Sequence, residues 1–184
     1  MKKEKKEKRD EKSNRAKAKP RRAKAKPRGG RRERRARRVS FAEVVRLSRA
    51  AVRKMRADGF KPDVLVGVGR GGWTPSVVVS NLLRNPRLYS VKCEYYDERD
   101  NPIAKPRISQ TVGLRVRGKR VLIVDEVADS GGSLRAIARH FRSLRCREFR
   151  FLVLHWKACA RFEPDYWGAR AAAGDWLKYP WDVK

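Results

Sequence analysis

Residues 121–134 of the chain read VLIVDEVADSGGSL and gather three kinds of chemically useful group. Four apolar residues lead into two adjacent carboxylates, Asp125 and Glu126, and a third acid, Asp129, follows three residues later. A small, hydroxyl-bearing loop at residues 130–133 then opens a helical pattern. Backbone N–H groups at a helix N-terminus bind phosphate, and acids at a strand end can hold ribose hydroxyls, directly or through Mg²⁺. The segment therefore predicts a site for a sugar phosphate.

Other nucleotide-binding motifs differ from this pattern. A P-loop would continue into Gly-Lys followed by Ser or Thr, and a dinucleotide fingerprint would place glycines before the acids. Neither spacing is present in residues 121–134. A Gly-rich turn between a strand and a helix is common by itself. The apolar run, the acid pair, the third acid and the serine-flanked glycines together are far more restrictive.

This combination resembles the phosphoribosyl-pyrophosphate signature of the type I phosphoribosyltransferases. The family loop usually carries Thr at its two ends, where this chain has Ser and keeps the hydroxyl. The resemblance implies that Asp125 and Glu126 hold the ribose hydroxyls and Mg²⁺, the expected cofactor. It also implies that Asp129 is the catalytic residue, which accepts the proton at purine N7 or forms a hydrogen bond to it. The residues implied to bind the 5′-phosphate are Ser130, Gly131, Gly132 and Ser133.

A second glycine-rich turn, residues 66–75 with the sequence VGVGRGGWTP, resembles the pyrophosphate loop of the 6-oxopurine phosphoribosyltransferases. Flanking glycines let the backbone approach a ligand closely, and the fork of Arg70 suits phosphate oxygens. The resemblance implies that Arg70 and Gly71 bind pyrophosphate. It also implies a cis peptide bond between Gly69 and Arg70.

The C-terminal residues 175–182, DWLKYPWD, resemble the hood of the xanthine-guanine phosphoribosyltransferases and their archaeal relatives. By that resemblance Trp176 covers the purine face, a stacking contact of about 1–3 kcal/mol. The backbone of Leu177 would meet the purine edge at position 2, and Lys157 would donate to the 6-oxo group. Lys178 stands where some relatives carry an acid, so the sequence does not rank guanine, xanthine and hypoxanthine.

The elements that must position these groups alternate between helical and extended patterns. Near-continuous apolar strands between helices indicate an α/β fold with a parallel sheet and helices on both faces, whose ligands bind at the carboxyl ends of strands. The resemblance makes this the type I phosphoribosyltransferase fold with a small C-terminal hood, mainly residues 157–184. We expect helices from Ser40 to about Gly59, at 73–83 and at 132–144, strands at 63–69, 88–96, 109–116, 120–125 and 149–155, and a mobile loop at 97–106.

Charge divides the chain into two parts. Its 184 residues have a net charge of +29, and residues 1–39 hold 21 Lys and Arg against 5 Asp and Glu. Residues 1–39 have almost no apolar side chain larger than Ala, so they are predicted to be a disordered basic tail before a domain at 40–184. The three cysteines lack metal-ligand spacing, and no segment resembles a secretory signal or a membrane span. We expect a cytoplasmic protein that does not contact membranes.

The basic tail contains a tandem repeat, RAKAKPR, at residues 15–21 and 22–28. One interpretation is an arm that contacts RNA, DNA or ribosomes without sequence specificity, because the tail has no aromatic residue for base stacking. The other is a dispensable, solvated extension or a start placed too far upstream. The two histidines, His140 and His155, have no partner motif and are interpreted as structural, and Trp181 is expected to pack the hood.

The predicted reaction transfers the 5-phosphoribosyl group from phosphoribosyl pyrophosphate to hypoxanthine, guanine or xanthine in purine salvage. We expect residues 97–108 to close over the site and exclude water. The resemblance also implies a homodimer or homotetramer. One alternative is a regulator on the same fold that senses phosphoribosyl pyrophosphate or nucleotide and binds nucleic acid. Another is an orotate or adenine enzyme, against which Lys157 and the Trp-rich ending argue.

Overall fold

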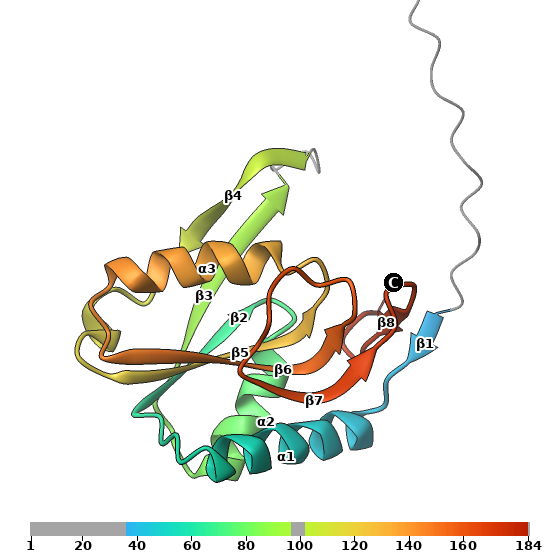
Figure 1. Ribbon diagram of the computed structural model, residues 1–184, viewed down its shortest axis with the longest axis horizontal. Coiled ribbons are helices and arrows are strands. Elements are labelled where there is room, and N and C mark those ends of the chain that lie inside the picture. The colour runs from blue at the N-terminus through green and yellow to red at the C-terminus, as the bar shows by residue number, and fades with distance from the viewer. Residues whose placement is uncertain (1–35, 97–101, 184) are drawn as a thin grey trace, which may run out of the picture. The chain divides into compact units, whose positions relative to one another are not determined.

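The computed structural model describes residues 36–96 and 102–183. Its main sheet has six strands in the order β4-β3-β2-β5-β6-β7, all parallel except β4, which runs antiparallel to β3 (Figure 1). A separate two-stranded parallel sheet pairs β1 with β8. The strands are β1 (Ala36–Arg38), β2 (Val64–Gly69), β3 (Leu88–Tyr96), β4 (Pro102–Gln110), β5 (Arg120–Ala128), β6 (Glu148–Lys157), β7 (Tyr166–Ala171) and β8 (Trp176–Lys178). The α-helices are α1 (Phe41–Ala57), α2 (Trp73–Leu83) and α3 (Gly132–Ser143).

Helices cover both faces of the main sheet, with α1 and α2 on one side and α3 on the other (Figure 1). Strand β5 shows why its sequence is continuously apolar. Val121 and Ile123 pack into the core cluster that contains the apolar residues of α3, whereas Leu122 and Val124 pack into the cluster with residues of α1 and α2. All four side chains are fully buried, as a central parallel strand requires. The predicted α/β fold with a mostly parallel sheet is confirmed.

Helix α1 begins where its capping residues predict. The hydroxyl of Ser40 accepts a hydrogen bond from the backbone N–H of Glu43 at 3.1 Å, which satisfies one of the free N–H groups of the first turn. Helix α2 forms despite its run of β-branched valines, and Pro75 lies in its first turn, where proline is tolerated. Helix α1 leads into β2, and α2 begins directly after the glycine-rich turn that follows β2.

The segment between β3 and β5 differs from the prediction. A strand was expected at 109–116, but β4 occupies Pro102–Gln110 and a 3-10 helix follows at Gly113–Val116. The apolar spacing that suggested a strand comes from Val112 and Val116, which are buried in the core from a turn and a 3-10 helix. The part of the expected mobile loop at 102–106 is strand because it pairs with the edge of β3, and residues 97–101 lie outside the described residues.

Two further boundaries differ from the prediction. Residues 36–38, assigned to the disordered tail, form β1, whose backbone groups pair with β8, and Val39 donates its backbone N–H to Lys178 O at 2.8 Å. The earlier part of the predicted tail, residues 1–35, lies outside the described residues. Strand β7, within the predicted hood, instead pairs with β6 at the edge of the main sheet. In the described ranges, no helix combines the length and apolar character needed to cross a membrane.

Candidate active site

A cleft of about 980 Å³ opens at the carboxyl ends of the central strands, against the two-stranded sheet of β1 and β8. Seven of the predicted site residues line it. They come from the turn after β2, the end of β5 and the segment after it, the end of β6, and β8. The seven are Arg70, Gly71, Glu126, Asp129, Lys157, Trp176 and Leu177. Asp125 and residues 130–133 are not among the residues that line the cleft. Each directly adjoins a lining residue in the sequence, Glu126 or Asp129.

Lys157 and Asp129 form an ion pair within this cleft, with 3.0 Å between Nζ and Oδ1. The register of the parallel strands brings them together. Ala128 of β5 pairs with Trp156 of β6, and Asp129 and Lys157 are the residues that follow this pair. The lysine side chain is 5% exposed, whereas the carboxylate is 59% exposed. A buried cation and an accessible carboxylate therefore lie side by side in the cleft wall. Trp176, 53% exposed, presents a large aromatic side chain to the same cleft.

The acid pair at the end of β5 is held by backbone and hood groups. Asp125 Oδ1 accepts a hydrogen bond from the backbone N–H of Glu126 at 2.8 Å. Glu126 Oε2 accepts one from Trp181 Nε1 at 2.6 Å. A Cβ atom on Gly71 would lie 2.2 Å from Glu126 Cδ, so a larger residue in the turn after β2 would displace this carboxyl group.

Burial controls the protonation of the acid pair. Burial raises the pKa of Asp125 well above its ordinary value, and the neighbouring charge of Glu126 raises it further. Burial also raises the pKa of Glu126 to about 7; the bond from Trp181 opposes this rise and the charge of Asp182 adds to it. A cation bound beside these two adjacent carboxyl groups would favour their ionised forms and lower both pKa values.

Replacement of Glu126 by Gln is expected to stabilise the protein at alkaline pH. Between the ordinary carboxyl pKa of 4.5 and about 7, the folded state binds more protons at this site than the unfolded state, so wild-type stability falls as pH rises through that window. Gln cannot ionise and keeps an oxygen for Trp181. The unfolding free energy of Glu126→Gln should exceed that of wild type by roughly 2 to 3 kcal/mol at pH 8 and match it near pH 4.5. Urea unfolding at both pH values checks this, and a difference independent of pH would contradict it.

Residues 130–133 form the entry to α3. The helix begins at Gly132 with no side-chain cap bond at Gly131, and Ser130 Oγ accepts the backbone N–H of Gly132 at 3.3 Å. The first turn of α3 therefore offers backbone N–H groups and the hydroxyl of Ser133 toward an anion. Gly131 has φ of 78°, and a Cβ there would lie 2.4 Å from Phe162 Cβ. Backbone conformation and close packing both require glycine at this position.

Replacement of Gly131 by Ala is expected to destabilise the fold by roughly 2 to 4 kcal/mol, the combined cost of left-handed backbone and overpacking against Phe162. Gly118 provides a matched control, because its φ is 66° and a Cβ there would meet no atom within 4 Å. Gly118→Ala should cost only the conformational part, about 1 to 2 kcal/mol. Chemical unfolding of both variants measures the difference, and equal losses would show that the contact with Phe162 yields without cost.

The turn after β2 has the shape that the resemblance implied. The peptide bond between Gly69 and Arg70 is cis. Gly72 packs so closely on β5 that a Cβ would lie 2.5 Å from the carbonyl oxygen of Val124. This packing holds Arg70 at the cleft wall, where its guanidinium is exposed for an anionic ligand.

Sequence reasoning missed part of the site in the hood. Trp181, expected only to pack, donates to Glu126, and its ring stacks on Tyr179 with 5.1 Å between centroids and 9° between planes. Tyr179 donates its hydroxyl to the backbone oxygen of Glu126 at 3.0 Å and contacts buried His155. The spacing of Tyr179 and Trp181, two residues apart, is the only sequence signal for this pair. By contrast, His140 lies on α3 and contacts Thr111, away from the cleft wall.

Comparison with known proteins gives one consistent group of relatives. A family model described as "Phosphoribosyl transferase domain" matches residues 40–184. The xanthine-guanine phosphoribosyltransferase of Cereibacter sphaeroides is 31% identical over 153 residues, which cover 79% of this chain and 86% of that protein. A purine phosphoribosyltransferase structure from Pyrococcus horikoshii has a TM-score of 0.69 at 31% identity and covers 80% of this chain and 94% of that one. A Neisseria gonorrhoeae protein with bound ppGpp has a TM-score of 0.70 at 27% identity and covers 80% and 90%.

Proposed function

The chain belongs to the phosphoribosyltransferase family, with the type I fold and purine phosphoribosyltransferases among its relatives, and from this we propose that it is a salvage enzyme for 6-oxopurines. The proposed reaction joins hypoxanthine, guanine or xanthine to phosphoribosyl pyrophosphate and yields a nucleoside monophosphate and pyrophosphate. The observation that carries this proposal is the ion pair between buried Lys157 and accessible Asp129, in the cleft that the exposed Trp176 also lines.

These three side chains suit the groups of a 6-oxopurine. The oxygen at position 6 and the nitrogen N7 lie on the same edge of the ring. An ammonium group is a donor only, so Lys157 favours an acceptor at position 6 and disfavours the amino group of adenine. Asp129 can accept the N7 proton on the adjoining atom, and Trp176 can stack on the purine face. Orotate lacks N7 and would leave Asp129 without this partner.

The chemistry asks the protein for placement and electrostatics. Purine N9 attacks C1′ as the bond from C1′ to pyrophosphate breaks, and positive charge develops on the ribose. The N7 proton passes to Asp129, so the product base is neutral. Arg70 faces the departing pyrophosphate, and the backbone N–H groups at the start of α3 hold the 5′-phosphate. The purine itself is the nucleophile, so no nucleophilic side chain is required.

Mg²⁺ fits the acid pair as an ion shared with the substrate. Asp125 and Glu126 provide the carboxylate oxygens that would hold it, and the bound ion would favour the ionised forms of both groups against the burial that raises their pKa values. The described residues contain no cluster of three His, Cys, Asp or Glu able to bind a metal alone. Mg²⁺ commonly binds through one or two carboxylates plus substrate phosphates, and there it would neutralise diphosphate charge.

Steady-state nucleotide formation from phosphoribosyl pyrophosphate and Mg²⁺ tests the proposal. Hypoxanthine, guanine, xanthine, adenine and orotate are assayed in parallel with the full chain. We expect turnover of one or more 6-oxopurines and little with adenine or orotate. Preferred use of adenine or orotate would overturn the assignment of the base.

A regulatory role is the second candidate for the same cleft. It is favoured by the Neisseria gonorrhoeae relative with bound ppGpp, a nucleotide that combines a guanine base with diphosphate groups. In this chain the base wall with Trp176 and Lys157 and the anion sites near Arg70 and α3 offer matching chemistry. Binding of ppGpp together with absent turnover for all five bases would favour the regulator.

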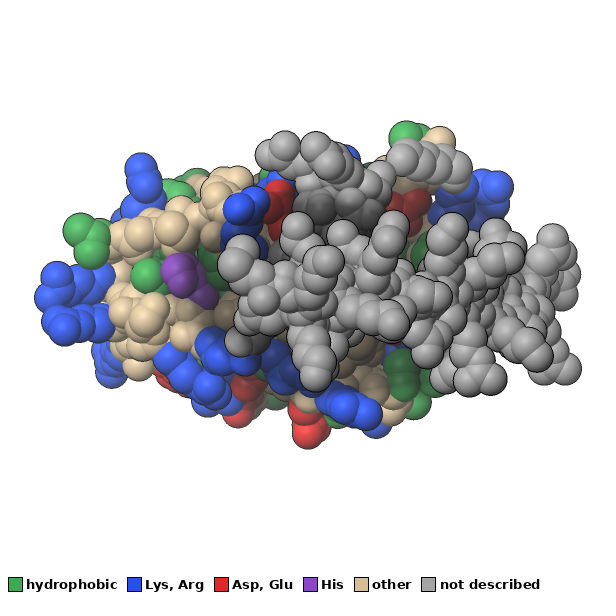
Figure 2. Space-filling view, turned by 90° about the horizontal axis from the view of Figure 1, so that it is seen from above, with side chains coloured by type: hydrophobic (Ala, Val, Ile, Leu, Met, Phe, Trp, Pro, Cys, Tyr) green, Lys and Arg blue, Asp and Glu red, His purple; other side chains and the backbone are tan. Residues whose placement is uncertain are grey.

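The basic tail is proposed to contact nucleic acid together with α1. The exposed side of α1 carries four arginines at helical spacing, and their helix follows directly after β1. Figure 2 shows that Lys and Arg side chains also lie along the rim of the opposite, α3 face, so charge alone does not identify the contact surface. The four arginines are Arg46, Arg49, Arg53 and Arg56.

Salt-dependent binding to a DNA duplex is the measurement for this surface. The full chain should bind without sequence preference, and neutralising Arg49 and Arg53 with Gln should reduce the slope of log affinity against log salt by about 2. Neutralising Arg139 and Arg142 on α3 is the matched control and should change the slope less. Equal changes in both variants would contradict a contact through α1.

A further inference from the structure

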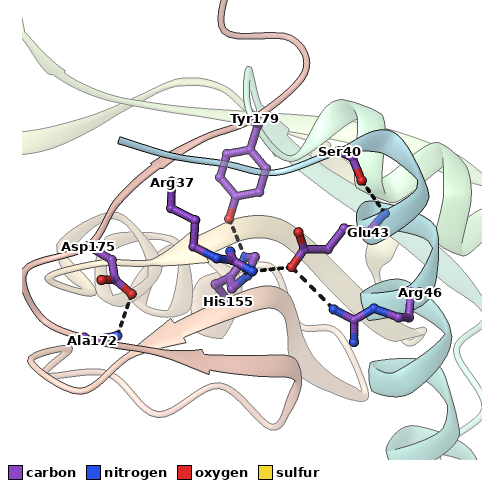
Figure 3. Close-up of polar contacts among 8 residues, drawn as sticks. All are labelled: Arg37, Ser40, Glu43, Arg46, His155, Ala172, Asp175 and Tyr179. Atoms are coloured by element: carbon purple, nitrogen blue, oxygen red, sulfur yellow. Dashed lines mark hydrogen bonds and ion pairs between the residues drawn. The ribbon is translucent and has the colours of Figure 1, made fainter. Parts of the chain in front are cut away.

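A chain of hydrogen bonds links the first strand to the acid pair, and Figure 3 shows Arg37, His155 and Tyr179, its members before Glu126. Arg37 Nη1 on β1 lies 3.3 Å from Nε2 of His155 on β6. The other ring nitrogen, Nδ1, lies 2.9 Å from the hydroxyl of Tyr179, which donates to the backbone oxygen of Glu126 at 3.0 Å. The four residues come from β1, β6, the hood and β5, and His155 is only 1% exposed.

The two ends of this chain fix its direction. A backbone oxygen only accepts, so the Tyr179 proton points to Glu126 and the phenol oxygen accepts from His155 Nδ1–H. A guanidinium only donates, so Arg37 requires a lone pair on His155 Nε2. Both conditions are met only by the neutral imidazole with its proton on Nδ1. The tautomer is therefore determined by the partners rather than by the ring.

The charged groups around His155 agree with a neutral ring. Burial lowers the pKa of His155 to about 4, and the positive charges of Arg37 and Arg46 lower it further, against the opposing effects of Glu43 and Asp175. Glu43 forms an ion pair with Arg37, and Asp175 accepts the backbone N–H of Ala172 at 3.0 Å (Figure 3). Each acid near the ring thus has another partner.

The chain ends at a residue that the hood holds at two points. Tyr179 binds the backbone oxygen of Glu126, and Trp181 binds its carboxylate. The β1–β8 register places Arg37 opposite Leu177, in the strand that carries the predicted base contacts. His155 lies two residues before Lys157 on β6. One hydrogen-bond chain thus connects β1, β6 and the hood with Glu126, one of the two acids proposed to hold the ribose.

We propose that Arg37, His155 and Tyr179 are positioning residues, whose tautomer-locked chain places the hood over the base site and thereby sets the affinity for purine. This rests on the proposed function. None of the three is expected to touch a reacting atom, so loss of the chain should weaken purine binding more than phosphoribosyl pyrophosphate binding. In this proposal β1, which carries Arg37, supports the purine site without contacting the reacting atoms.

Nitrogen-15 NMR of the histidine rings tests the chain without any activity measurement. The protein has only two histidines, so His140→Gln leaves His155 as the single signal. We expect the neutral Nδ1–H tautomer from pH 5.5 to 8, kept in Tyr179→Phe because Arg37 still requires the lone pair on Nε2, and a shift toward the Nε2–H form only when Arg37 is replaced by Gln as well. The Nε2–H tautomer in the parent protein, or a protonated ring at pH 6, would overturn the chain.

Kinetics of variants in the full chain test its effect on the base site. Tyr179→Phe removes the hydroxyl and both of its hydrogen bonds, and should raise the KM for a 6-oxopurine about tenfold, equivalent to about 1.4 kcal/mol, with kcat and the KM for phosphoribosyl pyrophosphate within about threefold of wild type. Arg37→Gln should do the same and Arg37→Lys should recover part of the effect, because Lys retains a donor. His140→Gln is the control. Equal changes in both KM values would overturn the positioning role.

Hydrogen exchange separates failure of this inference from failure of the proposed function. Amides of residues 176–182 should exchange faster in Tyr179→Phe than in wild type, while those of β5 stay protected. If wild type shows no turnover with any base, the proposed function fails, but the NMR and exchange results still decide whether the chain positions the hood. Unchanged exchange of the hood would overturn the inference even in an active enzyme.

Discussion

Asp129→Asn lowers kcat for 6-oxopurines by an expected 10²- to 10⁴-fold, the usual contribution of a positioned proton acceptor. Asn has nearly the same shape as Asp and can still accept a hydrogen bond, but it cannot take the N7 proton. The groups proposed to bind phosphoribosyl pyrophosphate, including Arg70 and the start of α3, are untouched by the change. Calorimetric affinity for phosphoribosyl pyrophosphate should therefore stay within about threefold of wild type, in contrast to the kcat effect.

A control is needed because the same change weakens the ion pair with buried Lys157. Thermal unfolding of the variant measures how much of the effect is structural. Asp175→Asn removes another carboxylate of the hood region, one that accepts a backbone N–H rather than facing Lys157. That variant should keep kcat near wild type. If Asp129→Asn also keeps its kcat, Asp129 has no role in proton transfer.

Lys157→Met raises the KM for 6-oxopurines by an expected 100-fold or more, because the 6-oxo group would enter a site with no donor in place of a charged one. Met is close to Lys in length and is well suited to a side chain that is only 5% exposed, so the fold should be kept. The affinity for phosphoribosyl pyrophosphate should change little. Discrimination against adenine should also fall, since the ammonium group no longer opposes the 6-amino group.

Steady-state kinetics over a range of purine concentrations measures this effect. Lys119→Met is the matched control, because Lys119 is an exposed cation in the turn before β5 and lies outside the cleft. Together the two site variants separate two roles: loss of Asp129 should act mainly on kcat, and loss of Lys157 mainly on KM. A KM for hypoxanthine that is unchanged in Lys157→Met would exclude the lysine from base recognition.

Much of the anion site was predictable because it is contiguous in sequence. The apolar run, acid pair and serine-flanked glycines follow one another along β5, the loop and α3, so their local order fixes which groups share the strand end. The same holds for the turn between β2 and α2. Alternation of apolar strands and helices was enough to predict an α/β fold, because strands buried on both faces need apolar residues throughout.

Other parts of the structure depended on partners that no local pattern identifies. Residues 36–38 look like the end of a charged tail, yet pairing with β8 gives their backbone a place in the hood. Strand β4 satisfies its backbone on the free edge of β3, although its sequence is charged and turn-rich. Backbone pairing depends little on side-chain type, so an edge strand can form without an apolar signature.

The sequence by itself determined the two glycine-rich segments proposed to bind anions, the apolar core strands and, through family resemblance, the class of reaction. Only the tertiary structure showed that Lys157 meets Asp129, because that contact follows from the register of β6 on β5. Likewise, Arg37 and His155 are 118 residues apart in the chain, and their hydrogen bond exists only because β1 joins the hood. Such contacts result from strand register and packing across the whole domain, which the short-range spacing of residues cannot specify.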